Sequence, residues 1–596
     1  MLEKHYSDSI GLEESTLSKL HRSSKILLWA KLFSFGFAVY AFYQYVFENL
    51  NAMWGLVSFV FLGLYLLIMF LDSKLQKNIN LHIQIKITLE NEIKYLNRDF
   101  SVFDDGSEFV DAKHSYSYDL DLFGKDSLFN RINRTVSKLG RIKLANYLQN
   151  LELSVTKIKE RQESIRELAQ QMNWRILFLS FGIDAHYDLS KLAESLQTES
   201  IKSSLVSKGM RLVMLLSSIS TIGLIIASIY DLVPVSFPST LFLIQLLICI
   251  TLSGKVTKAA NEVSGLLKGF KPYRELIKHV IDIKFQGAEL QSLQSKLRLD
   301  NSVDVTKAFT ELSAILNKFD QRANLLTYVI FNGLFMNDLW TLSKYLVWKK
   351  KNAPFMPAWV NVLGEFDALV SLGTYAYNNP QNCDVELLEG ELPVLRTKDV
   401  YHPFISKEVV VRNDFSLDQK TFAIITGANM AGKSTFLRSI GVNFIMALNG
   451  LPVCAKSFQV TPMNLFSSMR TSDNLVKNIS YFNAELIRLE DLIMSCKSNK
   501  HTLIILDEIL KGTNSIDKLK GSKLLLQEIS KLPVSGIIAT HDLDLTKLSE
   551  GSEKYFNYCF EIELAEEIKY TYRMEKGVAK NLNATYLLQK IIDKIN

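Results

Sequence analysis

Residues 421–435 read TFAIITGANMAGKST, and this stretch decides the fold of the C-terminal third of the chain. Its apolar beginning, FAII, predicts a buried strand, and the segment after the second glycine has the apolar spacing of a helix. Gly427, Gly432, Lys433 and Ser434 give the spacing G-x-x-x-x-G-K-S, which is typical of a phosphate-binding loop between a strand and a helix. A simple glycine turn before a helix is the alternative for the loop taken alone.

The residue types of this loop suit a nucleotide. Glycines let backbone N–H groups turn inward and form an anion site at a helix N-terminus. Lys433 is expected to reach the β- and γ-phosphates, and the Ser434 hydroxyl is expected to hold Mg²⁺. The predicted ATP-binding residues follow one another along the chain: Gly427, Ala428, Asn429, Met430, Ala431, Gly432, Lys433, Ser434 and Thr435.

Two further apolar runs end in groups that suit ATP hydrolysis. The run LIIL is followed by Asp507 and Glu508, and the run GIIAT is followed by His541. Because ligands of open parallel sheets bind at the carboxyl ends of the strands, we expect these groups to meet the loop at one edge. Asp507 would share Mg²⁺ with Ser434, Glu508 would activate water and His541 would sense the γ-phosphate. Singly, the acidic pair and the histidine could be surface residues; together they predict an ATPase with Glu508, His541 and Lys433 as catalytic residues.

Length, charge and cysteine content narrow the class of protein. At 596 residues the chain is too long for one hydrophobic core, so several domains are expected. A net charge of +6 permits a nucleic-acid or anionic-membrane partner without arguing for one. The five cysteines are scattered without paired or metal-type spacing, which indicates a reducing compartment and no zinc site.

Two pairs of apolar stretches predict membrane-spanning hairpins. The first pair is about 26–47 and 52–71, and the second, shorter and containing serines, is about 212–229 and 235–252. Buried core helices are the alternative. The all-round apolarity, with Lys31 as the one internal charge of the first pair, favours spans, and Lys31 is expected to snorkel toward the headgroups.

Charges around these stretches predict an orientation. The short links inside the two hairpins carry Glu48 and Asp231, whereas basic residues flank the open ends: Arg22, Lys25, Lys74, Lys77, Lys208, Arg211, Lys255 and Lys258. By the positive-inside rule, both termini and all large segments lie in the cytoplasm. We therefore expect a multi-pass protein of the inner or plasma membrane whose ATPase domain faces the cytoplasm.

The predicted fold class is multidomain, α and α/β, with N-terminal transmembrane helices, a helical middle and a C-terminal P-loop ATPase domain. The family resemblance described below implies that the helical middle is a lever or core domain and that the ATPase domain is of the ABC type. Within the last domain, 408–412 has the pattern of an antiparallel edge strand beside the main sheet. The predicted domains are 1–100 (first hairpin and stalk), 101–209 (lever), 210–254 (second hairpin), 255–385 (returning lever) and 386–596 (ATPase).

Several motifs resemble those of the MutS family of DNA mismatch-repair ATPases, in family order, over roughly residues 100–590. They are DLDLFG, SLFNRINRT, EFDALVSLG, YHP, TGANMAGKST, SYFNAE, LDEILKGTNSID and THDLDL. The chain departs from the common family pattern at Ala431, Tyr481 and Lys511. The resemblance also indicates that the mismatch-reading domain is missing ahead of residue 100, and that the second apolar pair stands where the family carries its DNA clamp.

The resemblance implies a homodimer in which each ATP site is completed by the neighbouring subunit. Ser480 of one subunit would contact the γ-phosphate held by the other, and 513–517 would line the seam; a helix N-cap is the alternative role for Ser480. Implied cofactors are ATP and Mg²⁺. Implied partners are a second copy and double-stranded DNA; the four predicted spans, rather than the resemblance, add a lipid bilayer.

Three functions are compatible with the sequence. The first is a membrane-anchored MutS-like ATPase coupled to binding of mismatched or branched DNA. The second is a mechanical or signalling ATPase at the membrane that does not use DNA. The third, an ABC-type transporter, is disfavoured because the sequence has only four predicted spans, no LSGGQ motif and no substrate path marked by charges within the spans.

Overall fold

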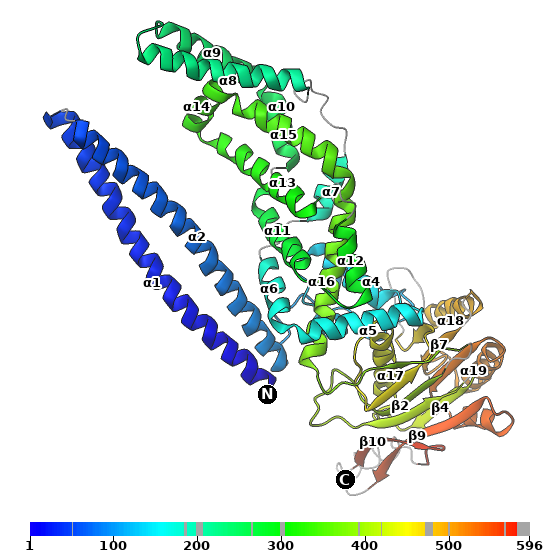
Figure 1. Cartoon of the computed structure of the whole chain (residues 1–596). Coiled ribbons are helices and arrows are strands. Elements are labelled where there is room, and N and C mark those ends of the chain that lie inside the picture. Colours follow the sequence, from blue (N-terminus) through cyan, green and yellow to red (C-terminus); the bar gives the residue numbers. More distant parts are fainter. Residues whose placement is uncertain are drawn as a thin grey trace, which may run out of the picture.

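The protein is described by a computed structural model that is mostly helical and contains two mixed sheets (Figure 1). It has an N-terminal helical hairpin, a helical lever and a C-terminal α/β domain. The described residues are 1–49, 52–183, 188–197, 207–263, 266–298, 304–390, 394–418, 420–470, 481–498, 501–564 and 568–580.

The N-terminal hairpin consists of α1 (Leu2–Tyr43) and α2 (Ala52–Leu96), which run side by side over their whole length (Figure 1). Near its open end, Tyr6 and Leu89 are buried against the lever. Toward the tip, large apolar side chains face outward, and Phe59 is 78% exposed. The hairpin therefore has a docked polar base and an apolar distal half without protein around it.

Lys31 and Asp72 fix how the two helices of this hairpin are aligned. The Lys31 ammonium donates to a carboxylate oxygen of Asp72 at 2.7 Å. The sequence analysis expected Lys31 to snorkel toward the headgroups and did not foresee this partner on the second helix. The ion pair lies where the apolar half of the hairpin begins.

The lever is a bundle built around one long helix, α16 (Met356–Asn378), most of whose residues are buried. Asp367 of α16 overlaps the position that a Cβ at Gly140 would take, so glycine is required at this crossing. The lever helices are α3 (Leu128–Ile132), α4 (Lys138–Gln149), α5 (Val155–Gln170), α6 (Met172–Gly182), α7 (Leu189–Gln197), α10 (Ser253–Val263), α11 (Leu266–Asp282), α12 (Ala288–Leu297), α13 (Val305–Asp320), α15 (Asn337–Asn352) and α16 (Met356–Asn378).

The far end of the lever carries a second apolar hairpin, α8 (Lys208–Ile229) and α9 (Ser236–Thr251) (Figure 1). A third apolar helix, α14 (Leu325–Phe335), packs against both. A Cβ at Gly333 of α14 would overlap the Phe242 ring of α9, so the two helices approach closely at this glycine. The sequence analysis missed α14 as part of this tip because 11 residues are too few to span a bilayer.

Three described helices are long and apolar enough to cross a membrane: α1 with its continuation to Phe47, α2 and α8. The expected four spans are not supported as such. Helix α9 has 16 residues, about 24 Å at helical rise, which falls short of a hydrocarbon core of about 30 Å. It passes the same test only together with Ser253–Asn261, and the chain bends by 50° between the two.

The C-terminal domain is organised by a six-stranded sheet of order β10-β9-β4-β8-β7-β6. All neighbouring strands are parallel except β10, which runs antiparallel to β9. Its elements are β4 (Phe422–Gly427), α17 (Lys433–Leu448), β6 (Asn464–Ser468), α18 (Tyr481–Ser498), β7 (Thr502–Asp507), α19 (Ser515–Ile529), β8 (Val534–Ala539), β9 (Tyr555–Leu564) and β10 (Ile568–Lys576).

A four-stranded sheet of order β1-β5-β2-β3 joins this domain to the lever. Its strands are β1 (Glu386–Leu387), β2 (Leu395–Val400), β3 (Asn413–Leu417) and β5 (Ser457–Val460). The prediction of an edge strand at 408–412 is wrong, because that stretch forms turns and coil. The edge strand is β3, which begins directly after it and pairs with β2 rather than with the main sheet.

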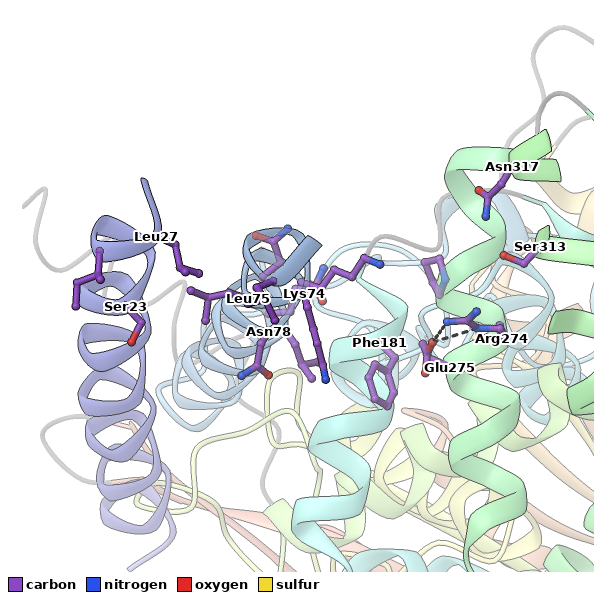
Figure 2. Close-up of a pocket in the computed structure, with 17 residues that line it drawn as sticks. Ser23, Leu27, Lys74, Leu75, Asn78, Phe181, Arg274, Glu275, Ser313 and Asn317 are labelled. Atoms are coloured by element: carbon purple, nitrogen blue, oxygen red, sulfur yellow. Dashed lines mark hydrogen bonds and ion pairs between the residues drawn. The ribbon is translucent and has the colours of Figure 1, made fainter. Parts of the chain in front are cut away.

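A cleft of about 1230 Å³ separates the N-terminal hairpin from the lever. Figure 2 shows one wall formed by α1 and α2, with Leu27 and Lys74, and the other by α6, α11 and α13, with Phe181 and Arg274. The hairpin and the lever are thus in contact at their bases and apart farther out (Figure 1).

Candidate active site

The glycine-rich loop lies between the fully buried strand β4 and the start of α17. Gly427 and Gly432 both have positive φ, 152° and 111°. A Cβ at Gly427 would lie 2.8 Å from the carbonyl oxygen of Phe560, so no side chain fits there. Gly432 is the N-cap of α17, whose first-turn N–H groups have no partner within the helix. The loop and helix start therefore form a concave site suited to an anion.

The Lys433 side chain is folded back into this loop. Its ammonium donates to the carbonyl oxygens of Gly427 at 2.8 Å and Ala428 at 3.0 Å. Burial lowers the pKa of Lys433 to about 8. Next to it, Asn429 and Met430 are exposed, and Met430 also has a positive φ of 66°. The lysine thus occupies the loop interior, where two carbonyl groups hold its charge.

Ser434 and Asp507 meet across the end of the sheet. The Ser434 hydroxyl, at the first turn of α17, donates to Oδ2 of Asp507 at 2.6 Å. Asp507 is the last residue of β7. Mg²⁺ is usually bound by one or two protein oxygens together with phosphate oxygens and water, so this hydroxyl–carboxylate pair fits that ion.

Glu508 and His541 form an ion pair beside the same loop. His541 Nε2 lies 2.6 Å from Oε1 of Glu508, and because a carboxylate only accepts, the imidazole is the donor. This hydrogen bond lowers the pKa of Glu508 to about 2, and Lys518 at 3.7 Å acts in the same direction. Glu508 also has a positive φ of 57°, a backbone conformation that costs about 1–3 kcal/mol in a residue other than glycine.

The other nitrogen of His541 joins this pair to the loop. His541 Nδ1 lies 3.1 Å from the Gly427 carbonyl oxygen and 3.3 Å from Lys433 Nζ. The strand order β4-β8-β7 explains the meeting, since β8, which precedes His541, lies between the strands that carry the loop and the acidic pair. One hydrogen-bonded chain therefore connects Glu508, His541 and Lys433.

The structure brings most of the predicted residues together and leaves one outside. Thr435 lies in the first turn of α17 with an exposed side chain, while Ala431 and Gly432 close the loop. Ser480 lies outside the described residues, so its predicted role in trans stays a prediction. The predicted seam, 513–517, is mostly exposed and contains Asn514, the N-cap of α19.

The connector between α2 and α3, residues 97–127, contacts this domain through Asp119 and Asp121, which the sequence analysis did not foresee. Asp121 accepts from Arg438 of α17 at 2.9 Å and from Arg470 at 2.6 Å. Asp119 accepts from the Ser467 hydroxyl at 2.8 Å. The signal in the sequence was the alternation in DLDLFG, which buries its leucines and leaves the carboxylates for arginines.

The C-terminal part of the chain matches known proteins. Residues 423–588 match the family model described as MutS domain V. The DNA mismatch repair protein MutS of Acetivibrio thermocellus is 33% identical over 232 residues, which are 37% of this chain and 26% of the relative. MutS of Aquifex pyrophilus is 33% identical over 226 residues, again 37% and 26%. Endonuclease MutS2 of Thermus thermophilus is 31% identical over 180 residues, 30% and 24%.

These matches cover about a quarter of the length of each relative. The domain V match contains the loop, Asp507, Glu508 and His541, and the three candidate spans precede it in the chain. The similarity therefore covers the end of the molecule that carries the candidate site and does not reach its apolar end.

Proposed function

The chain belongs to the MutS family through its C-terminal ATPase domain, and from this premise we propose that it is a membrane-associated ATPase. In this proposal it binds ATP with Mg²⁺, hydrolyses it as a homodimer in the cytoplasm and transmits the resulting movement through the lever to helices in the bilayer. The proposal rests above all on the inverted burial of the apolar hairpins.

Inverted burial means that polar groups point inward and apolar groups point outward. In α8, Ser218 and Thr221 are buried, and the Gln245 amide of α9 donates to the Thr221 hydroxyl at 2.7 Å. Most leucine and isoleucine side chains of α8 are exposed. Water does not favour such a surface, whereas hydrocarbon does, and satisfied polar groups between helices are typical of packing in membranes.

The geometry of the ATP site supports hydrolysis by positioning and charge stabilisation. Phosphates would bind where the Lys433 ammonium now contacts loop carbonyls, and Lys433 would turn to them as their counter-charge. Ser434 and Asp507 would hold Mg²⁺, which supplies charge neutralisation on the phosphate oxygens.

Glu508 is the group that would accept a proton from the attacking water. With its pKa held at about 2 by His541, it is a weak base in the arrangement seen here. ATP binding would draw His541 toward the γ-phosphate and free Glu508. In this proposal, the Glu508–His541 hydrogen bond restrains the base until the nucleotide is in place.

Movement at the ATP site has a direct route to the lever. Helix α17 begins at the loop, and its Arg438 contacts Asp121 of the connector. The side chain of Leu120, between the two aspartates, lies against Gly441 of α17, where an added Cβ would come within 2.7 Å. A shift of α17 would thus be passed to the connector through both a charge contact and a packing contact.

Cell fractionation with an ATPase assay tests this proposal. The full chain should sediment with membranes, resist washing with high salt and alkaline carbonate, and require detergent for extraction; the extracted protein should hydrolyse ATP. Recovery of folded protein in the soluble fraction without detergent would disprove membrane association. A lack of ATP hydrolysis by extracted, folded protein that binds ATP would disprove the proposed activity.

Coupling to DNA is the second candidate function, and the names of the relatives favour it. Two of them are DNA mismatch repair proteins and one is an endonuclease. Homoduplex, mismatched and branched DNA should then stimulate the ATPase, and binding should weaken steeply with salt because phosphate contacts release counterions. Equal ATPase rates with and without each DNA would favour the DNA-independent mechanical or signalling function.

A further inference from the structure

A pocket of about 420 Å³ lies where α13 and α15 meet the beginning of α8. This is the junction between the lever and its apolar tip (Figure 1). Its volume is within the range of pockets that hold a small ligand or a headgroup. The residues that decide its chemistry are four cations and one acid: Arg211, Lys318, Lys344, Lys351 and Glu311.

The positive charge of this pocket is not neutralised within the described part of the chain. There, Lys318, Lys344 and Lys351 have no carboxylate oxygen within 4.0 Å. Burial lowers the pKa of Lys318, and repulsion from the ammonium group of Lys344 lowers it further. An anion in the pocket would relieve this repulsion and would gain several charge-assisted hydrogen bonds.

The pocket lies at the boundary between apolar and polar surface. Arg211 lines it, and the next residues of α8, Leu212 and Val213, are exposed apolar side chains of the candidate span. Trp340 also lines the pocket, and tryptophan favours the headgroup level of a bilayer. A molecule with an anionic head and an apolar tail can therefore keep its head in the pocket and extend its tail along α8, without burying charge in hydrocarbon.

We propose that this pocket binds the phosphate of an anionic phospholipid, with the acyl chains lying along α8. The proposal rests on the membrane association proposed above and adds a lipid class and a site. Basic pockets at the cytoplasmic ends of transmembrane helices have the chemistry for such headgroups. The larger cleft of Figure 2 is less suitable, because its Arg274 is already paired with Glu275.

Two pairs of lysines on the same helices provide the test. Lys318→Ser with Lys344→Ser removes two charges from the pocket. Lys307→Ser with Lys350→Ser removes two exposed charges from α13 and α15 outside the pocket, so net charge and helix composition change equally. Retention of phosphatidylglycerol and of phosphatidylcholine by the full chain in detergent is measured by native mass spectrometry over a lipid titration.

The parent should retain phosphatidylglycerol in preference to phosphatidylcholine. The pocket variant should bind phosphatidylglycerol about thirtyfold more weakly, the effect of removing two such lysine contacts, and the surface variant should match the parent. Inorganic phosphate at millimolar concentration and duplex DNA serve as competitors. Neither should displace the lipid, because neither supplies the chains that lie on α8.

Equal loss in both variants, or no preference between the two lipids, would overturn the proposal. Displacement by inorganic phosphate would assign the pocket to a free anion instead, and displacement by DNA would assign it to nucleic acid. ATP hydrolysis and detergent-dependent solubility of the pocket variant are measured in parallel and should equal those of the parent. Failure of the lipid site is thereby distinguished from failure of the proposed function, which would appear in the parent as well.

Discussion

His541 donates to Glu508 at 2.6 Å, and its second ring nitrogen lies 3.3 Å from the ammonium of Lys433. The group proposed to activate water and the group proposed to hold the phosphates are therefore joined through one imidazole. Because the ring nitrogen that faces Lys433 also faces the loop, a nucleotide bound as proposed would meet this chain of contacts at His541.

Replacement of Glu508 by glutamine tests its role as the base. Glu508→Gln keeps the size of the side chain but cannot take a proton, so ATP turnover should fall by about 10²–10⁴ while ATP still binds. Single-turnover phosphate release and equilibrium binding of a fluorescent ATP analogue measure the two effects separately. Glu490→Gln, an exposed change on α18, is the control. Turnover within twofold of the parent would remove Glu508 from this role.

The lowered pKa of Lys433 predicts a pH dependence of ATP affinity. Below about pH 8 the lysine is charged before ATP arrives, whereas above it a proton must be taken up on binding, because bound phosphates favour the charged form. The dissociation constant should thus be flat from pH 7 to 7.5 and rise toward tenfold per pH unit between about 8.5 and 9.5. Binding is measured in the Glu508→Gln background to prevent hydrolysis.

Lys433→Arg is the matched control for that titration, since arginine stays charged over the whole range. Its affinity should be lower at neutral pH, because the longer guanidinium does not fit between the two loop carbonyls, but independent of pH. A parent curve that stays flat to pH 9.5 would contradict the assignment of the titrating group to Lys433.

The sequence predicted the strand, the glycine loop and the helix of the candidate site because all three are encoded within 15 consecutive residues, 421–435. It also predicted that Asp507, Glu508 and His541 would meet the loop, since parallel strands share one carboxyl edge. It did not predict that β8 would lie between β4 and β7, because strand order depends on packing across the whole sheet. The Glu508–His541 ion pair follows from that order.

Sequence patterns did not predict the contacts between segments that are distant in the chain. The Asp121–Arg438 contact joins residues 317 positions apart, and neither residue has a periodic or motif signal that names the other. The error at 408–412 has a local cause: the three consecutive valines, 409–411, favour a strand by residue type, but turns and coil occupy the stretch and β3 starts at Asn413. The shortfall in spans has a geometric cause, the bend after α9.

Asp121→Ala tests the route from the ATP site to the lever. Asp121 is about one-third exposed, and exposed ion pairs contribute about 0–1 kcal/mol, so the variant should fold and bind ATP normally. Hydrogen exchange in the lever helices α4 and α5 should respond to ATP in the parent and respond much less in the variant. Asp418→Ala, which removes an exposed pair with Arg396 away from the connector, should keep the full response. An unchanged response in Asp121→Ala would show that the movement takes another route.

The buried ion pair between Glu92 and Arg134 is expected to hold the base of the N-terminal hairpin on the lever. The two side chains are almost fully buried and pair at 2.7 Å, and Asn378 of α16 donates to the second carboxylate oxygen at 2.6 Å. Glu92→Ala leaves the Arg134 charge buried without its partner, which costs about 3–5 kcal/mol. The hairpin base should then open, so limited proteolysis of detergent-extracted protein should cut near residue 97 far faster than in the parent.

Glu90→Ala removes only an exposed pair with Lys86 on the same helix and should leave the cleavage rate unchanged. Equal cleavage rates in the two variants would mean that the apolar contacts of Tyr6 and Leu89 hold the base without this ion pair.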